Sequence, residues 1–271
     1  MVKIAGTRKR CNQLDGKTWT RYSISVWNDI KKSPGELRLK HPAAFPLELA
    51  ERCIQIFTSG PGELVLDPFA GTGTTLIAAA RLGRCGVGTE LYPHYLELFR
   101  ERLAAEGEGA AAGGLAPPPR LYQDDARHLK RYLKKDSVDF VLTSPPYWDI
   151  LTARRTADRK EQRCYGDREG DLGLTEDYAL FLQQLGEVFG LVGEVLKAGR
   201  YLAVVVMDLR KKNRFYPLHM DLARVLQERG FTLDDLIIWD RRHEYNNLRP
   251  LGYPSVFRVN KVHEYLLLFK K

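Results

Sequence analysis

Short apolar runs alternate with longer amphipathic stretches along most of the chain. The apolar runs predict strands over 64–67, 86–91, 121–127, 138–143, 201–207, 232–239 and 264–269. The stretches between them predict helices over 46–57, 93–105, 175–196 and 219–229, and a further helix that begins near Thr74 or Thr75, either of which can cap it. Strands that alternate with helices form a mostly parallel sheet, so the pattern predicts an α/β fold with one doubly wound sheet. We expect ligands at the carboxyl ends of its strands.

Other features of the chain narrow the classes of protein. Residues 106–119 are rich in glycine, alanine and proline, which predicts a surface loop. No run of 18 apolar residues and no apolar signal core occur, so we expect a cytoplasmic protein without a transmembrane helix. The four cysteines are far apart, and no His, Asp or Glu cluster has metal-ligand spacing, so we predict no catalytic metal.

A glycine turn follows the first predicted strand. The strand ends at Asp67, and Gly71 and Gly73 come soon after it. Glycines at these positions let a ligand approach the backbone and allow positive φ. The turn lacks the third glycine of a dinucleotide fingerprint and the lysine of a phosphate-binding loop. Glu90 ends the next strand, where a carboxylate commonly binds two ribose hydroxyls, although an exposed strand-end acid is the alternative.

A second motif closes the strand over 138–143. Pro145 and Pro146 have no backbone N–H, and Pro145 holds Ser144 in an extended conformation. The resulting turn brings together the Ser144 hydroxyl, the Pro145 carbonyl and the Tyr147 ring. Two acceptors beside an aromatic face suit a planar base that carries an exocyclic amine. For the proline pair alone, a structural turn is the alternative.

Together, the turn over 67–74 and the motif over 144–147 resemble the central motifs of the S-adenosylmethionine-dependent DNA amino-methyltransferases, which methylate cytosine N4 or adenine N6. Residues 41–46 resemble the segment that packs over the methionine end of the cofactor, and 262–269 resemble the last strand. The resemblance covers about 24–271. It implies a Rossmann-like, seven-stranded methyltransferase fold with an antiparallel last strand, in a single domain over 1–271. Within it, 1–62 would pack over the cofactor site, and 151–174 and 240–260 are candidate recognition insertions.

The resemblance also implies S-adenosylmethionine as the cofactor. Glu90 would accept both ribose hydroxyls, and Asp125, or Asp124 instead, would accept the adenine amino group. A capping or solvent-facing role is the alternative for either aspartate. Asp67 and Phe69 would line the methionine end, with a plain core role as the alternative for Phe69. The cofactor-binding residues predicted in this way are Phe45, Pro46, Asp67, Phe69, Ala70, Gly71, Thr72, Gly73, Thr74, Glu90, Leu91, Asp125 and Ala126.

The predicted catalytic residues are Ser144, Pro145, Pro146 and Tyr147. An exocyclic amine is a poor nucleophile because its lone pair is delocalised into the ring. Hydrogen bonds from its protons to the Ser144 hydroxyl and the Pro145 carbonyl would favour a pyramidal nitrogen and stabilise its developing charge. Tyr147 would stack on a base flipped out of the duplex. Serine at position 144 resembles the cytosine-N4 enzymes, so we predict a site-specific cytosine-N4 DNA methyltransferase, with adenine N6 as the alternative.

The net charge of +8 suits a polyanionic partner. We expect DNA, with RNA as the alternative, and the resemblance adds a cognate restriction endonuclease as a further partner; no membrane is expected. Arginine and asparagine bind base edges, and arginine and lysine contact phosphates, whereas solvated basic loops are the alternative. The candidate nucleic-acid contacts are Trp148, Arg154, Arg155, Arg210, Arg241, Arg242, Asn246 and Arg249.

Other functions remain open at this point. An RNA amino-methyltransferase would share every feature above, because the fold does not distinguish the nucleic acids. A methyltransferase of glutamine side chains would use the same acceptors. A nucleic-acid-binding protein with a degenerate site is the alternative from a different functional class.

Overall fold

The computed structural model describes residues 11–37, 45–109, 118–148, 168, 170–244, 255–256 and 258–271. Within these residues, eight strands form one sheet in the order β1-β9-β10-β6-β5-β2-β3-β4. The strand β10 runs antiparallel to both of its neighbours, and the other pairs are parallel. The strands are β1 (Val26–Trp27), β2 (Leu64–Asp67), β3 (Cys85–Glu90), β4 (Arg120–Gln123), β5 (Val138–Thr143), β6 (Leu196–Val206), β9 (Thr232–Asp240) and β10 (His263–Lys270).

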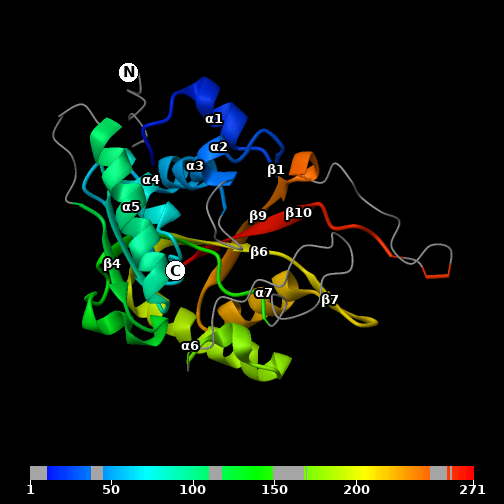
Figure 1. Ribbon diagram of the computed structural model, residues 1–271. Helices are drawn as coiled ribbons and strands as arrows, with labels where there is room; N and C mark the ends of the chain where they lie inside the picture. The colour runs from blue at the N-terminus through cyan, green and yellow to red at the C-terminus, as the bar shows by residue number, and fades with distance from the viewer. Residues whose placement is uncertain are drawn as a thin grey trace, which may run out of the picture.

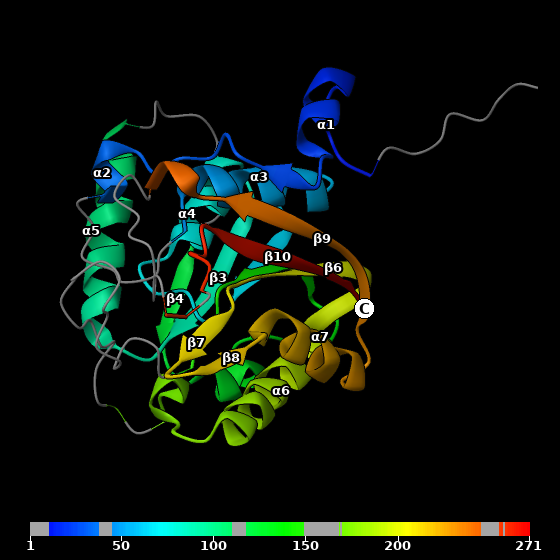
Figure 2. The same cartoon turned by 90° about the vertical axis from the view of Figure 1, so that its right-hand side faces the viewer.

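Helices cover both faces of this sheet (Figures 1 and 2). On one face lie α3 (Leu47–Phe57) and α4 (Thr74–Arg81), and on the other α6 (Tyr178–Val195) and α7 (Leu218–Glu228). The strand β5 is buried along its whole length, and alternate residues pack into the two cores, with Phe140 in one and Val141 in the other. The remaining helices are α1 (Gly16–Tyr22), α2 (Pro34–Leu37), α5 (Pro93–Gly109) and the 3₁₀ turns η1 (Ala126–Arg131), η2 (Leu172–Leu174) and η3 (Arg242–Glu244). No helix in the described part of the chain is long and apolar enough to cross a membrane.

The predicted α/β fold with a mostly parallel sheet and an antiparallel last strand is confirmed, but the predicted number of seven strands is wrong by one. The additional strand β1 pairs with β9, with Val26 opposite Ile238. Two residues are too few to produce a readable periodicity, so the pattern did not indicate this strand. A separate ribbon of β7 (Leu209–Lys211) and β8 (Arg214–Tyr216) was also not predicted as strands. The predicted strand over 121–127 ends at Gln123, because Asp125 caps η1.

A buried arginine attaches the N-terminal segment to the sheet. Arg52 on α3 is 1% exposed, and its two terminal nitrogens each lie 2.9 Å from a carboxylate oxygen of Asp29. Its guanidinium also lies over the rings of Tyr22 and Trp27, at 4.5 and 5.0 Å from their centroids. Breaking such a pair would leave an uncompensated buried charge, so this contact fixes where β1 meets β9.

The glycine turn after β2 places the first turn of α4. The helix begins at Thr74 as predicted, but neither threonine caps it; its N-cap is Gly73, with φ at +76°. The Thr75 hydroxyl instead donates to the carboxylate of Asp67 at 2.7 Å, and the Thr74 hydroxyl accepts from Arg102. The capping prediction was therefore wrong, because both hydroxyls bind neighbouring segments in preference to the helix's own N–H groups.

Two glycines with nearly the same backbone conformation allow a matched test of this turn. A Cβ at Gly73 would lie 2.2 Å from the Phe99 ring, whereas a Cβ at Gly199, with φ at +74°, would meet nothing within 4 Å. We expect Gly199→Ala to lower the free energy of unfolding by about 1–2 kcal/mol, from left-handed strain alone. Gly73→Ala should lose about 1–3 kcal/mol more from overpacking. Urea denaturation measures both, and equal losses would contradict the packing described for Phe99.

Candidate active site

A cavity opens at the carboxyl ends of β2, β3 and β5, and about 840 Å³ of empty space lies within it and its open mouth. Pro46, Gly73, Pro145 and Tyr147 are not among its lining residues, whereas the other predicted cofactor and catalytic residues are. Those that line it are Phe45, Asp67, Phe69, Ala70, Gly71, Thr72, Thr74, Glu90, Leu91, Asp125, Ala126, Ser144 and Pro146. Residues 41–44 of the predicted cover over 41–46 lie outside the described residues, whereas Phe45 lines the cavity.

Glu90 is held by two backbone groups at the edge of the cavity. One carboxylate oxygen accepts from the N–H of Gly71 at 2.9 Å, and the other from the N–H of Tyr92 at 2.8 Å. Burial raises the pKa of the Glu90 carboxyl to about 7, although these two hydrogen bonds act in the opposite direction. Each carboxylate oxygen has a second accepting position, so two further O–H donors can bind.

Asp67 joins the glycine turn to the end of β5. Its carboxylate is 2% exposed and accepts from the hydroxyls of Thr75 and Thr143, both at 2.7 Å, and from the N–H of Phe69 at 3.1 Å. Burial raises the pKa of the Asp67 carboxyl to about 6, despite these three donors. The residue reaches the cavity wall, but its oxygens bind the protein. Sequence reasoning missed Thr143, whose position beside the Ser144 motif was the available signal.

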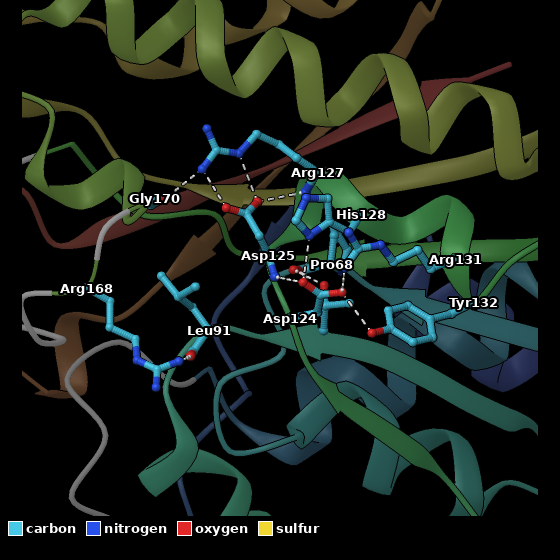
Figure 3. Close-up of polar contacts among 11 residues, drawn as sticks. Pro68, Leu91, Asp124, Asp125, Arg127, His128, Arg131, Tyr132, Arg168 and Gly170 are labelled. Carbon is cyan, nitrogen blue, oxygen red and sulfur yellow. Dashed lines mark hydrogen bonds and ion pairs between the residues drawn. The ribbon is translucent and has the colours of Figure 1, made fainter.

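The two adjacent aspartates at the end of β4 point in different directions (Figure 3). All four accepting positions of Asp124 are used, by its neighbour's N–H and by His128, Arg131 and Tyr132. Burial opposes the change, but the hydrogen bonds from His128 and Tyr132 lower the pKa of the Asp124 carboxyl below its usual range.

Asp125 caps η1 by accepting from the backbone N–H of Arg127, and it also forms an ion pair with the Arg127 side chain. One of its oxygens accepts from the N–H and Nε of Arg127, and the other from a terminal nitrogen of the same side chain at 2.5 Å. The second oxygen keeps one accepting position toward a ligand. The structure therefore gives Asp125 the capping contact that was the alternative, and it leaves Asp125 better placed than Asp124 to accept a further hydrogen bond.

A wall of the cavity opposite the glycine turn was not predicted. The Tyr92 hydroxyl donates to Asp171 at 2.7 Å, and Arg168 donates to the carbonyl of Leu91 at 2.9 Å. Gly170, Asp171 and Leu172 then line the cavity. The position of Tyr92 two residues after Glu90 was a weak signal, and no pattern in the sequence indicated Asp171.

Behind Ser144 lies a buried carboxylate that sequence reasoning also missed. The Ser144 Oγ is 2.8 Å from the Tyr147 hydroxyl, which donates to Glu264 at 2.8 Å. Tyr147 is 8% exposed and Glu264 is 6% exposed. One signal was available, since Glu264 shares its strand face with Leu266 and Leu268, which are buried. An acid at the start of a buried face needs a partner.

Trp148 is enclosed by other aromatic residues. It is 4% exposed, its indole N–H donates to the Thr175 carbonyl at 2.8 Å, and its ring centroid lies 5.0 Å from that of Tyr178 and 4.8 Å from that of Tyr216. A ring packed in this way presents no open face to a base. The aromatic cluster thus buries Trp148 in this structure, and its nucleic-acid contact stays a prediction.

The predicted basic contacts have different surroundings. Arg241 is 17% exposed and forms ion pairs with Glu264 and Glu244, and its nucleic-acid contact stays a prediction. Arg242 is 72% exposed although it pairs with Asp240. Arg210 is exposed on the β7–β8 ribbon, which projects from the body of the protein (Figure 1). Arg154, Arg155, Asn246 and Arg249 lie outside the described residues.

Comparison with known families decides between the classes of enzyme that this cavity could serve. The family model described as DNA methylase matches residues 6–101 and 138–271. The chain belongs to this DNA methylase family. The two matched ranges contain both the glycine turn with Glu90 and the motif at Ser144. The remaining lining residues Asp124, Asp125 and Ala126 lie between the matched ranges.

Individual relatives of this chain match over shorter stretches. The Type II methyltransferase M.ScaI of Streptomyces caespitosus is 39% identical over 104 residues, which are 36% of this chain and 32% of the relative. The tRNA (guanine(6)-N2)-methyltransferase of Thermus thermophilus is 34% identical over 117 residues, which are 38% of this chain and 33% of the relative. The alignments thus span about a third of either relative's length.

A solved structure with the same fold is the precorrin-6y C5,15-methyltransferase of Geobacter metallireducens. Its TM-score is 0.54 at 13% identity, over 90% of this chain and 100% of that one. At this identity the likeness shows the shared fold alone.

The cofactor of this family, and of this chain, is S-adenosylmethionine. The cavity residues fit it. Glu90 has two accepting positions for the ribose hydroxyls, and Gly71, with φ at +52°, lines the cavity in a conformation that side chains rarely adopt. Asp125 lines the same cavity.

The raised pKa of Glu90 predicts a pH dependence of cofactor binding. Ribose hydroxyls donate to the carboxylate form, and protonation below about pH 7 removes an accepting position. We expect the affinity for S-adenosylmethionine to fall by about tenfold as the pH decreases from 8 to 6. Calorimetric titrations of the wild type and Glu90→Gln would measure it. Groups of the cofactor titrate equally with both proteins, so the difference between the two pH profiles of affinity is due to Glu90. Parallel profiles would argue against a role of Glu90 in binding the ribose.

Proposed function

We propose that this chain transfers a methyl group from S-adenosylmethionine to the exocyclic amine of a base in DNA, at a specific sequence, and that the base is cytosine, methylated at N4. The observation that carries the proposal is that Ser144 and Glu90 line one cavity. An amine accepted by Ser144 would therefore face the cofactor, whose ribose binds at Glu90. Cofactor and amine would then meet in one site, which converts a bimolecular reaction into a local one.

The acceptors for the amine come from the turn after β5. When bound, S-adenosylmethionine supplies an electrophilic methyl group. The Ser144 hydroxyl and the Pro145 carbonyl would accept the two protons of the amine, which favours a pyramidal nitrogen with its lone pair toward the methyl group. Stacking of the flipped base on Tyr147 remains part of the proposal, although only 8% of this side chain is exposed.

The choice of cytosine N4 rests on the serine at position 144, and adenine N6 is the alternative. Among the relatives of this chain, the Streptomyces protein is named a Type II methyltransferase, and this name supports a DNA substrate. A cognate restriction endonuclease stays part of the proposal. RNA is the second candidate substrate, which the name of the Thermus relative favours. Both candidates need the same acceptors, because both place an exocyclic amine at Ser144.

The β7–β8 ribbon is the described element that best suits nucleic-acid binding. Arg210, Lys212 and Arg214 are exposed on it, and Phe215 is 39% exposed beside Arg210 and Lys261. A two-stranded ribbon fits a DNA groove, and its cations can contact phosphates.

We further propose that 1–271 is one domain, that 1–62 packs over the cofactor site, and that 151–174 and 240–260 are recognition insertions.

A transfer assay with labelled S-adenosylmethionine tests the function. We expect label in duplex DNA and N4-methylcytosine by nucleoside mass spectrometry, and we expect Ser144→Ala to lower the rate by about 100-fold or more. N6-methyladenine would replace the base assignment, label in RNA alone would favour the second candidate, and no label in any nucleic acid would refute the proposal.

Ser137 offers a matched control for that variant. It lies at the opposite end of β5, where its hydroxyl donates to the carbonyl of Lys134. Ser137→Ala should leave the transfer rate unchanged, so a loss in this variant as well would assign the effect of Ser144→Ala to the strand and not to the amine acceptor.

The ribbon makes a separate prediction about affinity. Arg210→Ala and Arg214→Ala should each weaken DNA binding and lower the slope of log Kd against log salt by about 1, since each removes one phosphate contact. Lys135→Ala is the control, because Lys135 is exposed in the turn at the amino end of β5, whereas the ribbon follows the carboxyl end of the neighbouring strand β6. Fluorescence anisotropy at several salt concentrations measures the slopes, and unchanged slopes for both ribbon variants would exclude the ribbon from the contact.

A further inference from the structure

A chain of hydrogen bonds leads from the cavity into the protein behind Ser144. The Ser144 Oγ lies 2.8 Å from the Tyr147 hydroxyl, and this hydroxyl lies 2.8 Å from Oε2 of Glu264. Glu264 comes from β10, 117 residues after Tyr147 in the sequence. Its other oxygen binds Arg241, whose second terminal nitrogen lies 2.5 Å from Glu244. The catalytic turn is thus backed by a buried ion pair.

The number of protons available to these hydrogen bonds fixes which group donates and which accepts in each of them. A phenol has one proton to donate, and the Glu264 carboxylate can only accept it. The backbone carbonyl of Val205, 3.4 Å from the same hydroxyl, is also only an acceptor. The Tyr147 oxygen must therefore accept in its contact with Ser144. The serine hydroxyl then donates to Tyr147, and the lone pairs of Ser144 Oγ stay available for another donor.

We propose that Glu264 is a positioning residue for methyl transfer, which acts through Tyr147 to keep the Ser144 hydroxyl in the accepting orientation that an exocyclic amine requires. This inference rests on the proposed function and deepens it. Without a carboxylate behind Tyr147, the phenol proton could point to Ser144 and occupy the lone pair that should receive the amine proton. Arg241 fixes the carboxylate in place, which accounts for a half-buried, ion-paired arginine where a nucleic-acid contact was predicted.

A merely structural role for Glu264 makes a different prediction. The residue is 6% exposed beside Arg241, so any change to it is expected to reduce stability. A structural loss would affect the protein whether or not Tyr147 carries a hydroxyl. If Glu264 acts by orienting the hydroxyl, its effect on the rate passes through the phenol of Tyr147. A change to Glu264 should then have no further effect on the rate once that phenol hydroxyl has been removed.

The experiment is a double-mutant cycle with Glu264→Gln and Tyr147→Phe. In Glu264→Gln, the donors of Arg241 should attract the amide oxygen, so the amide N–H would face Tyr147. The amide would then donate to the phenol oxygen, and the direction of donation in the hydrogen bonds toward Ser144 would be reversed. We expect the single-turnover rate of methyl transfer to DNA to fall by about tenfold or more in either single variant, with the Kd for S-adenosylmethionine within about twofold of wild type. In the Tyr147→Phe background, Glu264→Gln should cause no further loss of rate.

Glu63→Gln is the matched control, since Glu63 is a partly buried glutamate paired with Arg200 at the far end of β2, at 2.5 Å. The methyl-transfer rate of Glu63→Gln should equal that of the wild type.

Equal loss of rate from Glu264→Gln in both backgrounds would overturn the inference, as would a wild-type rate in Glu264→Gln. If Glu264→Gln does not fold, a wild-type rate in Tyr147→Phe alone would overturn it. A wild type that transfers no methyl group would refute the proposed function, and the inference with it.

Discussion

The buried carboxylate of Asp67 is the constraint on which the site depends. It accepts hydrogen bonds from Thr75 at the start of α4, from Thr143 at the end of β5 and from the backbone of Phe69. One side chain thus joins the glycine turn, which would lie beneath the cofactor, to the strand that would carry the proposed amine acceptors. Since hydrogen bonds replace its lost hydration, the buried acid serves to set the separation between the two halves of the site.

Two further carboxylates have distinct functions around the same cavity. Glu90 lines it with two accepting positions left for a ligand, whereas Glu264 lies behind the catalytic turn and binds only protein groups among its described contacts. Asp67 lies between these two functions, at the cavity wall but with its oxygens already bonded. Burial therefore does not distinguish a binding carboxylate from a structural one; the number of accepting positions that remain does so.

The sequence predicted those parts of the fold and site that depend on neighbours in the chain. The strand over 138–143 and the positive φ of Gly71 and Gly73 follow from local pattern and from the chemistry of single residues, and the structure confirms them. The two-residue strand β1 could not be predicted, because it exists only through its pairing with β9. Likewise, the contact of Tyr147 with Glu264 joins residues 117 positions apart, so no spacing rule could indicate that the tyrosine hydroxyl points into the sheet.

In the proposed site, one cavity holds the cofactor by Glu90 and presents Ser144 to the amine. A crystal structure of the chain with S-adenosylhomocysteine tests this arrangement directly. We expect both ribose hydroxyls on the Glu90 carboxylate, the adenine amino group at the free position of Asp125, and the sulfur facing Ser144. A ribose bound away from Glu90, or a sulfur that faces away from Ser144, would contradict it.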